Sequence, residues 1–115
     1  MSRDPAQRLA DMLRCCRKIM RYTNGTTLKS LLENEMAYDA VHSNLVILTE
    51  AARNLPDSAK ASFPNVPWRE IIAMRTLLVH EYFRLNEYVL WPTVTEDFPA
   101  LADQIEEFLH VPRLV

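Results

Sequence analysis

Apolar residues in this chain recur every three or four positions, and nowhere do they alternate with polar residues for long enough to form a strand. That spacing matches the 3.6-residue turn of an α-helix. Asp4 followed by Pro5 predicts the first helix start, because aspartate caps helix N-termini and proline suits the first helical position. The apolar face of this helix runs to about Tyr22 and comprises Leu9, Met12, Leu13, Cys16, Ile19 and Met20.

Glycine, proline and capping residues divide the rest of the chain. Gly25, in "TNGT", ends the first helix, and a second helical stretch runs from Thr26 or Thr27 to about Asn54, with a joint near Asn34. The stretch "LPDSAKASFPNVP", residues 55–67, holds three prolines and is the one long loop. A third helix, begun near Pro67, covers residues 68–83.

The last third of the chain predicts two more helices. A short one is capped by Asn86 and limited or kinked by Pro92. The next starts with Asp97 near its cap and Pro99 in its first turn, and its apolar face comprises Phe98, Leu101, Ile105, Phe108 and Leu109. The whole pattern predicts one all-α domain over residues 1–115, a bundle of four to five helices.

Composition excludes several classes of protein. Gly25 is the only glycine, which rules out the glycine-rich phosphate loops of P-loop and Rossmann proteins. No apolar run reaches the roughly 20 residues that span a bilayer, and a start charged from Arg3 is no signal peptide. Cys15 and Cys16 are adjacent, which suits structural thiols in a reducing cytoplasm. Together with three scattered histidines they predict no metal site and no cofactor.

Charge is distributed unevenly along the chain. The formal net charge is −2, yet residues 1–21 hold six basic and two acidic side chains, whereas residues 96–107 hold five acidic and no basic ones. Four of the basic residues follow the i, i+3, i+4, i+7 spacing of one helix face. This basic ridge is either an ordinary solvated face or a surface that faces RNA, and it comprises Arg14, Arg17, Lys18 and Arg21.

One residue of the third helix is out of place. At about 100° per residue, a core-facing stripe forms in "WREIIAMRTLLVHEYF", and Arg75 lies in the middle of it. An ion pair with Glu50 or Glu35 of the preceding helix would explain Arg75, although desolvation offsets much of the attraction in such pairs. A homodimer interface is a second explanation, because arginine is enriched there. The stripe comprises Trp68, Ile71, Ile72, Leu78, Val79 and Tyr82.

His80 adds a catalytic explanation for Arg75. The two side chains are about 140° apart on an ideal helix, so they converge only if the helix loosens near His80 or if a two-fold axis brings two subunits together. Around one cleft, imidazole would move the proton of an RNA 2′-hydroxyl and guanidinium would stabilise phosphate charge. His42 and His110 have no comparable partners in the sequence and are interpreted as incidental.

The stretch "RTLLVHEY", residues 75–82, resembles the R-x4-H-x-Y signature of HepT-like ribonuclease toxins in the HEPN (higher eukaryotes and prokaryotes nucleotide-binding) superfamily. The resemblance extends in order through "ILTEAARNLP", "FPNVPWREI", "HEYFRLN" and "VLWPTVTEDFPAL", and so covers nearly the whole chain. It implies a HEPN-like helical homodimer with the motif arginine and histidine of both subunits at a shared cleft.

The same resemblance implies a function and a partner. The protein would be the toxin of a type VII toxin–antitoxin system, a cytoplasmic, metal-independent endoribonuclease with Arg75 and His80 as its active-site pair. A MntA-type nucleotidyltransferase antitoxin would add AMP to Tyr82, placing negative charge where the RNA backbone must lie. The alternative for Tyr82 is an amphipathic residue at a helix end without chemistry.

Two positions depart from the family pattern. Thr76 stands where the family most often has Asn, four residues before His80, so an amide that would orient the imidazole is replaced by a shorter hydroxyl. Thr49 replaces the glycine of the family's "GEA", which bears on helix packing. The departure at Thr76 keeps a rival hypothesis: a catalytically inactive helical module that dimerises and binds the nucleotidyltransferase.

Overall fold

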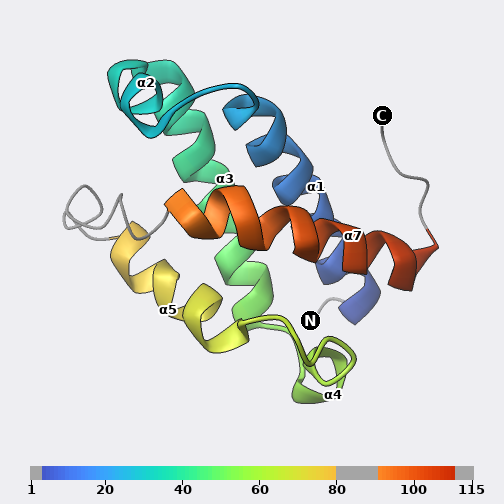
Figure 1. Ribbon diagram of the computed structural model, residues 1–115. Helices are drawn as coiled ribbons and strands as arrows, with labels where there is room; N and C mark the ends of the chain where they lie inside the picture. The colour runs from blue at the N-terminus through green and yellow to red at the C-terminus, as the bar shows by residue number, and fades with distance from the viewer. Residues whose placement is uncertain (1–3, 80–90, 111–115) are drawn as a thin grey trace.

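The computed structural model describes residues 4–79 and 91–110, which form a bundle of helices (Figure 1). The predicted all-α fold is confirmed, since those two ranges contain no strand. No helix in them is long and apolar enough to cross a bilayer. The elements are α1 (Pro5–Thr23), α2 (Leu28–Glu33), α3 (Glu35–Arg53), α4 (Asp57–Lys60), α5 (Trp68–Leu78), the π-helix η2 (Thr93–Asp97) and α7 (Phe98–Leu109).

Capping side chains set the ends of the first helices. The Asp4 carboxylate accepts a hydrogen bond from the backbone N–H of Ala6 at 2.8 Å, which confirms the predicted start of α1. Gly25 follows that helix with a φ of 72°, in the left-handed region that glycine adopts without strain. The Thr27 hydroxyl then accepts from the Ser30 N–H at 3.1 Å and caps α2.

The predicted joint near Asn34 separates two helices. Its side chain accepts a hydrogen bond from the Ala37 N–H at 3.1 Å, and its own N–H donates to the Leu31 carbonyl at 3.1 Å. Asn34 therefore ends α2 and begins α3, so one predicted stretch is two helices. The predicted loop over residues 55–67 also contains a short helix, α4.

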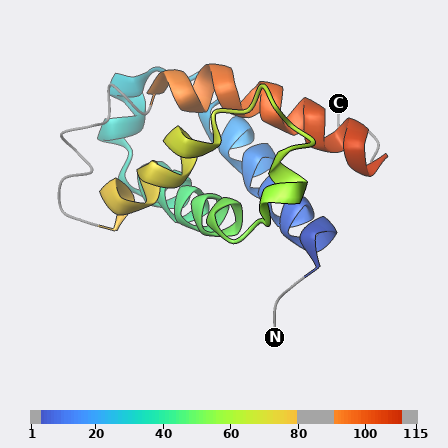
Figure 2. The ribbon, with the colours of Figure 1, turned by 90° about the horizontal axis from the view of Figure 1, so that it is seen from below.

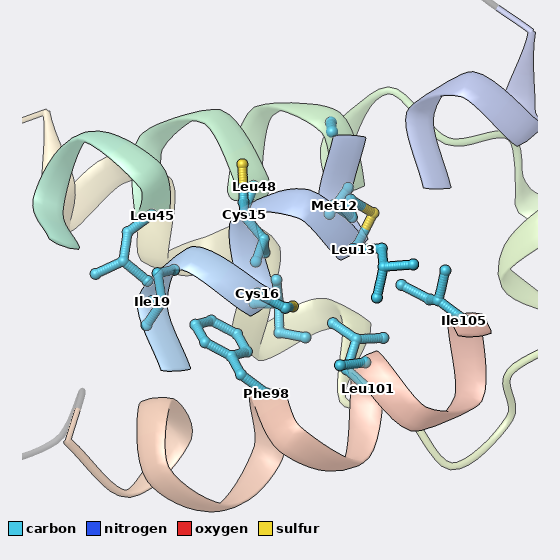
Figure 3. Close-up of a cluster of buried hydrophobic side chains, with 14 of the residues drawn as sticks. Met12, Leu13, Cys15, Cys16, Ile19, Leu45, Leu48, Phe98, Leu101 and Ile105 are labelled. Carbon is cyan, nitrogen blue, oxygen red and sulfur yellow. The ribbon is translucent and has the colours of Figure 1, made fainter. Parts of the chain in front are cut away.

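The core lies where three long helices meet. α1 lies beside α3, α7 crosses α1, and α5 packs against the other side of α3 (Figures 1 and 2). Figure 3 shows the α7 side chains pointing toward α1, with α3 completing the cluster. The buried residues drawn there include Met12, Leu13, Cys15, Cys16 and Ile19 of α1, Leu45 and Leu48 of α3, and Phe98, Leu101 and Ile105 of α7.

Thr49 fits into this core without an unpaired hydroxyl. The residue is fully buried, and its Oγ1 donates to the Leu45 carbonyl at 2.9 Å. A buried hydroxyl is costly only when it lacks a hydrogen-bond partner. The threonine that stands in place of the family's glycine is therefore compatible with close packing of α3.

α5 is shorter than the sequence predicts. It begins at Trp68, whose indole N–H donates to the carbonyls of Lys60 and Phe63, each at 3.2 Å. It ends at Leu78 rather than continuing to residue 83, and Val79 takes a φ of −91° and a ψ of −1°. Val79, the residue after the last turn, is 52% exposed instead of core-facing. The predicted last turn of this helix, residues 80–83, and the predicted helix start at Asn86 lie outside the described ranges.

The last helix, α7, begins at Phe98, with Asp97 at its N-cap position and Pro99 in its first turn, as the sequence predicts. Asp97 has helical backbone angles and its side chain makes no capping hydrogen bond, because the π-helix η2 leads directly into α7. Pro99 lacks the N–H that would bond to the Thr95 carbonyl. In the turn before Pro99, the backbone hydrogen bonds span five residues instead of four. The result is η2, where the Phe98 N–H donates to the Thr93 carbonyl. Pro92 is itself helical and does not end the helix.

Candidate active site

Arg75 lies in the last turn of α5, where that helix packs on α3. Its Nε forms an ion pair with Oε2 of Glu50, and both side chains remain partly exposed. Of the two partners that the sequence offers, Glu50 is therefore the one that Arg75 meets. Glu35 lies at the other end of α3, in its first turn.

Glu50 is held by further groups of its own helix. Asn54 Nδ2 donates to its Oε1 at 3.0 Å, and Arg53 Nη2 donates to the same oxygen at 3.3 Å. Partial desolvation raises the pKa of Glu50, but the bond from Asn54 and the charges of Arg53 and Arg75 together lower that pKa below its ordinary value. The carboxylate is thus ionised near neutral pH and fixed against α5.

This arrangement leaves Arg75 able to bind an anion. The ion pair with Glu50 uses Nε, whereas a guanidinium carries four more N–H donors on its two Nη atoms. Arginine forks of this kind match the geometry of phosphate oxygens. Glu50 can therefore hold the side chain in one direction while the outer nitrogens meet a ligand.

Of the other predicted site residues in this motif, the structure describes only Thr76. Thr76 follows Arg75 on α5 and is exposed. His80 and Tyr82 lie outside the described residues.

His42 has a structural partner that the sequence does not indicate. Its Nε2 lies 2.7 Å from the carbonyl oxygen of Leu78, at the end of α5. His42 therefore contacts the helix that carries Arg75. No local pattern reports this contact, because the two residues are 36 positions apart in the chain.

The basic ridge lies on α1 and lines a hollow of about 430 Å³. Two of its four cations already meet carboxylates: Arg14 pairs with Asp11 at 2.6 Å, and Arg17 pairs with Glu106 of α7 at 3.3 Å. The ridge is thus partly neutralised, and one of its residues ties two helices together. The hollow is lined by Ala10, Leu13, Arg14, Arg17, Lys18, Arg21 and Leu109.

The ridge and Arg75 belong to different parts of the bundle. Arg75 lies where α5 packs on α3, whereas the ridge lies on α1 beside α7, so α3 separates α5 from α1 (Figure 1). The structure therefore does not bring the two sets of predicted site residues together within one chain.

The two cysteines are free and buried, which confirms their interpretation as structural thiols. Burial raises the pKa of the Cys16 thiol strongly, and burial also raises the pKa of Cys15 despite the nearby charges of Arg14 and Lys18. Across residues 4–79 and 91–110, no three His, Cys, Asp or Glu side chains are grouped so that they could hold a metal ion.

Residues 12–108 match the family described as Ribonuclease HepT-like, so the chain belongs to that family. Membership supports a ribonuclease function. No solved structure gives a significant match.

Named relatives agree with that assignment over nearly their whole lengths. The chain is 35% identical over 107 residues to the probable ribonuclease HepT of Thermococcus cleftensis, covering 93% of this chain and 97% of that protein. It is 33% identical over 104 residues to a candidate RNase of Methanocaldococcus jannaschii, covering 90% and 95%. A candidate RNase of Caldanaerobacter subterraneus is 31% identical over 106 residues, covering 92% and 95%.

Proposed function

We propose that this protein is the toxin of a type VII toxin–antitoxin system: a cytoplasmic, metal-independent endoribonuclease that acts as a homodimer. Arg75 and His80 form its active site, and a MntA-type nucleotidyltransferase antitoxin neutralises it by adding AMP to Tyr82. The observation that carries the proposal is an arginine held through its Nε by Glu50, on a partly exposed face of a HepT-like bundle.

The proposed reaction is an internal transesterification of RNA. His80 takes the proton of a 2′-hydroxyl, whose oxygen then attacks the neighbouring phosphorus. The bond from phosphorus to the 5′-oxygen breaks, and a protonated histidine supplies the proton to that leaving oxygen. In the dimer, His80 of the second subunit is available for this step. Arg75 stabilises the extra negative charge on the phosphate oxygens as the new bond forms.

Exposed apolar residues beside the ion pair support a dimer interface at this face. Ile47 lies three residues before Glu50 on α3, and Val79 lies four residues after Arg75, so each shares a helix side with its charged neighbour. Both are about half exposed. Apolar side chains that flank an arginine are typical of protein interfaces.

AMP addition at Tyr82 accounts for neutralisation in electrostatic terms. Each AMP brings a negatively charged phosphate and a nucleoside to a residue seven positions from Arg75 in the sequence. The added charge competes with the RNA phosphate for the guanidinium, and the added bulk blocks the cleft. We propose the basic ridge as a secondary RNA contact through Lys18 and Arg21, the two ridge cations with no carboxylate partner in the described ion pairs.

One observation favours the rival function, an inactive helical module that dimerises and binds the nucleotidyltransferase. The Arg75–Glu50 pair joins α5 to α3, so Arg75 has a structural task that requires no substrate. Thr76 in place of the family's Asn points the same way.

Cleavage by purified, unmodified protein in EDTA separates these functions. Total tRNA and a single-stranded messenger serve as substrates, with His80→Ala as the test variant and His110→Asn as the control, because His110 has a φ of 56° that asparagine tolerates. We expect cleavage by the wild type and by the control, and none by His80→Ala. Equal behaviour of all three proteins, with folding and dimer intact, would favour the inactive module.

A further inference from the structure

His42 connects α3 to the end of α5 by a short hydrogen bond. Its Nε2 lies 2.7 Å from the Leu78 carbonyl oxygen, and because a carbonyl only accepts, Nε2 carries the hydrogen and donates it. The imidazole is partly buried, and it stacks on the Tyr38 ring at a centroid distance of 6.5 Å with 16° between the planes. The ring is therefore held in place on α3.

The bond acts at a position that helices leave unsatisfied. The last carbonyls of an α-helix have no N–H partner within it, and they form its negative end. Leu78 is the last residue of α5, so His42 supplies a donor to the helix C-terminus. This contact coincides with the early end of α5, two residues before His80 in the sequence.

Two side chains of α3 thus hold the last turn of α5. Glu50 fixes the side chain of Arg75 at the beginning of that turn, and His42 fixes the backbone at its end. One tie acts on a guanidinium and the other on a carbonyl, so they restrain different atoms. Their combined effect is to set both the position of Arg75 and the point from which the chain leads to His80.

We propose that His42 is a positioning residue for RNA cleavage, which anchors the end of α5 so that Arg75 keeps its place against the phosphate that is cleaved. The inference rests on the proposed ribonuclease function. Geometry of this kind matters strongly, since a misplacement of about 1 Å costs up to roughly 100-fold in rate. Imidazole suits the task because it is short and rigid, whereas a lysine donor would allow the helix end to shift.

The test uses two substitutions that separate the donor from the ring. His42→Phe keeps an aromatic ring beside Tyr38 but has no N–H donor, and His42→Gln keeps an N–H donor but has no ring. His110→Asn is the matched control, because His110 ends α7 with a φ of 56° that asparagine tolerates. Four quantities are measured: single-turnover cleavage, binding of the same RNA with methylated 2′-hydroxyls, the unfolding midpoint, and hydrogen exchange of peptides over residues 70–80.

We expect cleavage by His42→Phe to fall about tenfold or more, with RNA binding and unfolding midpoint near those of the wild type. Exchange at the end of α5 accelerates in that variant, and His42→Gln recovers part of both losses. Cleavage by His42→Phe within twofold of the wild type would overturn the inference and leave the ribonuclease function standing. A matching loss of RNA binding or of folding would assign His42 a structural role only. A wild type that cleaves no RNA would overturn both proposals.

Discussion

Within residues 4–79 and 91–110, two arginine–glutamate pairs join helices, and their surroundings differ. Arg17 of α1 meets Glu106 of α7 at 3.3 Å, and their side chains are 21% and 10% exposed. Arg75 of α5 meets Glu50 of α3 with 34% and 39% exposed. The same two functional groups therefore make one contact that is largely closed to solvent and one that a ligand can reach.

The neighbours of each carboxylate sharpen this difference. Glu50 accepts additional hydrogen bonds from Asn54 and Arg53 on its own helix, so it is fixed before it holds Arg75. Glu106 is a buried residue that contacts α1 across the edge of the core. The two ion pairs contain the same chemical groups. They differ in solvent exposure and in the hydrogen bonds that orient the glutamate, and these two properties indicate which pair can serve a function.

Removing each arginine in turn should separate catalysis from architecture. We expect Arg75→Ala to slow single-turnover RNA cleavage by about 100-fold or more, because charge that develops on the phosphate loses its stabilising donor. Arg17→Ala should slow cleavage by less than about threefold at a temperature where it stays folded, since mutations without a transition-state contact leave this rate largely intact.

Sedimentation of both variants provides the control. If Arg75→Ala loses activity only because the dimer dissociates, Arg75 serves the interface and the catalytic assignment fails. If Arg17→Ala is the slower enzyme while folded and dimeric, the chemistry belongs to the α1–α7 side instead.

Arg17→Ala should destabilise the fold more than Arg75→Ala does, which is the opposite of their expected order in cleavage. Arg17→Ala leaves the buried Glu106 carboxylate with fewer partners, and we expect a loss of about 1–3 kcal/mol in the free energy of unfolding. Arg75→Ala removes a more exposed pair and should cost about 1 kcal/mol or less. Urea denaturation measures both.

A double variant makes the comparison sharper. Replacing Arg17 and Glu106 together with methionine should recover most of the stability, because an apolar pair of similar size avoids the buried charge. No recovery would mean that the pair stabilises α1 against α7 through its charges.

Local signals in the sequence predict most of this fold. Asp4, Gly25 and Asn34 act through hydrogen bonds or backbone angles within a few residues, so each helix end they mark can be read directly from the chain. Two features of the fold were not predicted, and each has a physical cause. The π-helix depends on where Pro99 removes a donor, and α5 ends at a residue that bonds to His42 of another helix.

In the candidate site, too, local features could be predicted from the sequence, whereas contacts between helices could not. The position of Arg75 in an apolar stripe is a local anomaly, and it correctly indicates an ion pair with the preceding helix. The separation of the basic ridge from Arg75 depends on which helices pack together, which spacing within one helix does not encode. The bond from His42 to Leu78 is missed for the same reason, since it joins residues 36 positions apart.

The smallest expected effect concerns pH and the exposed pair. The folded-state pKa of Glu50 lies below its ordinary value near 4.5, so the unfolded chain binds this proton more tightly than the folded protein does. The resulting stabilisation is complete above about pH 4.5 and is lost as pH falls through the lower, folded-state pKa. Solvent screening limits its size to about 0.5 kcal/mol.

Glu50→Gln isolates that contribution from the other carboxyl groups. We expect the wild type to exceed Glu50→Gln in unfolding free energy at pH 7, and the difference to shrink as the pH falls below 4.5 and through the lower, folded-state pKa of Glu50. A difference that stays constant over that pH range would mean that Glu50 acts through its hydrogen bond with Asn54 rather than through charge. Arg75 would then be held by shape alone, and the electrostatic contrast between the two helix pairs would disappear.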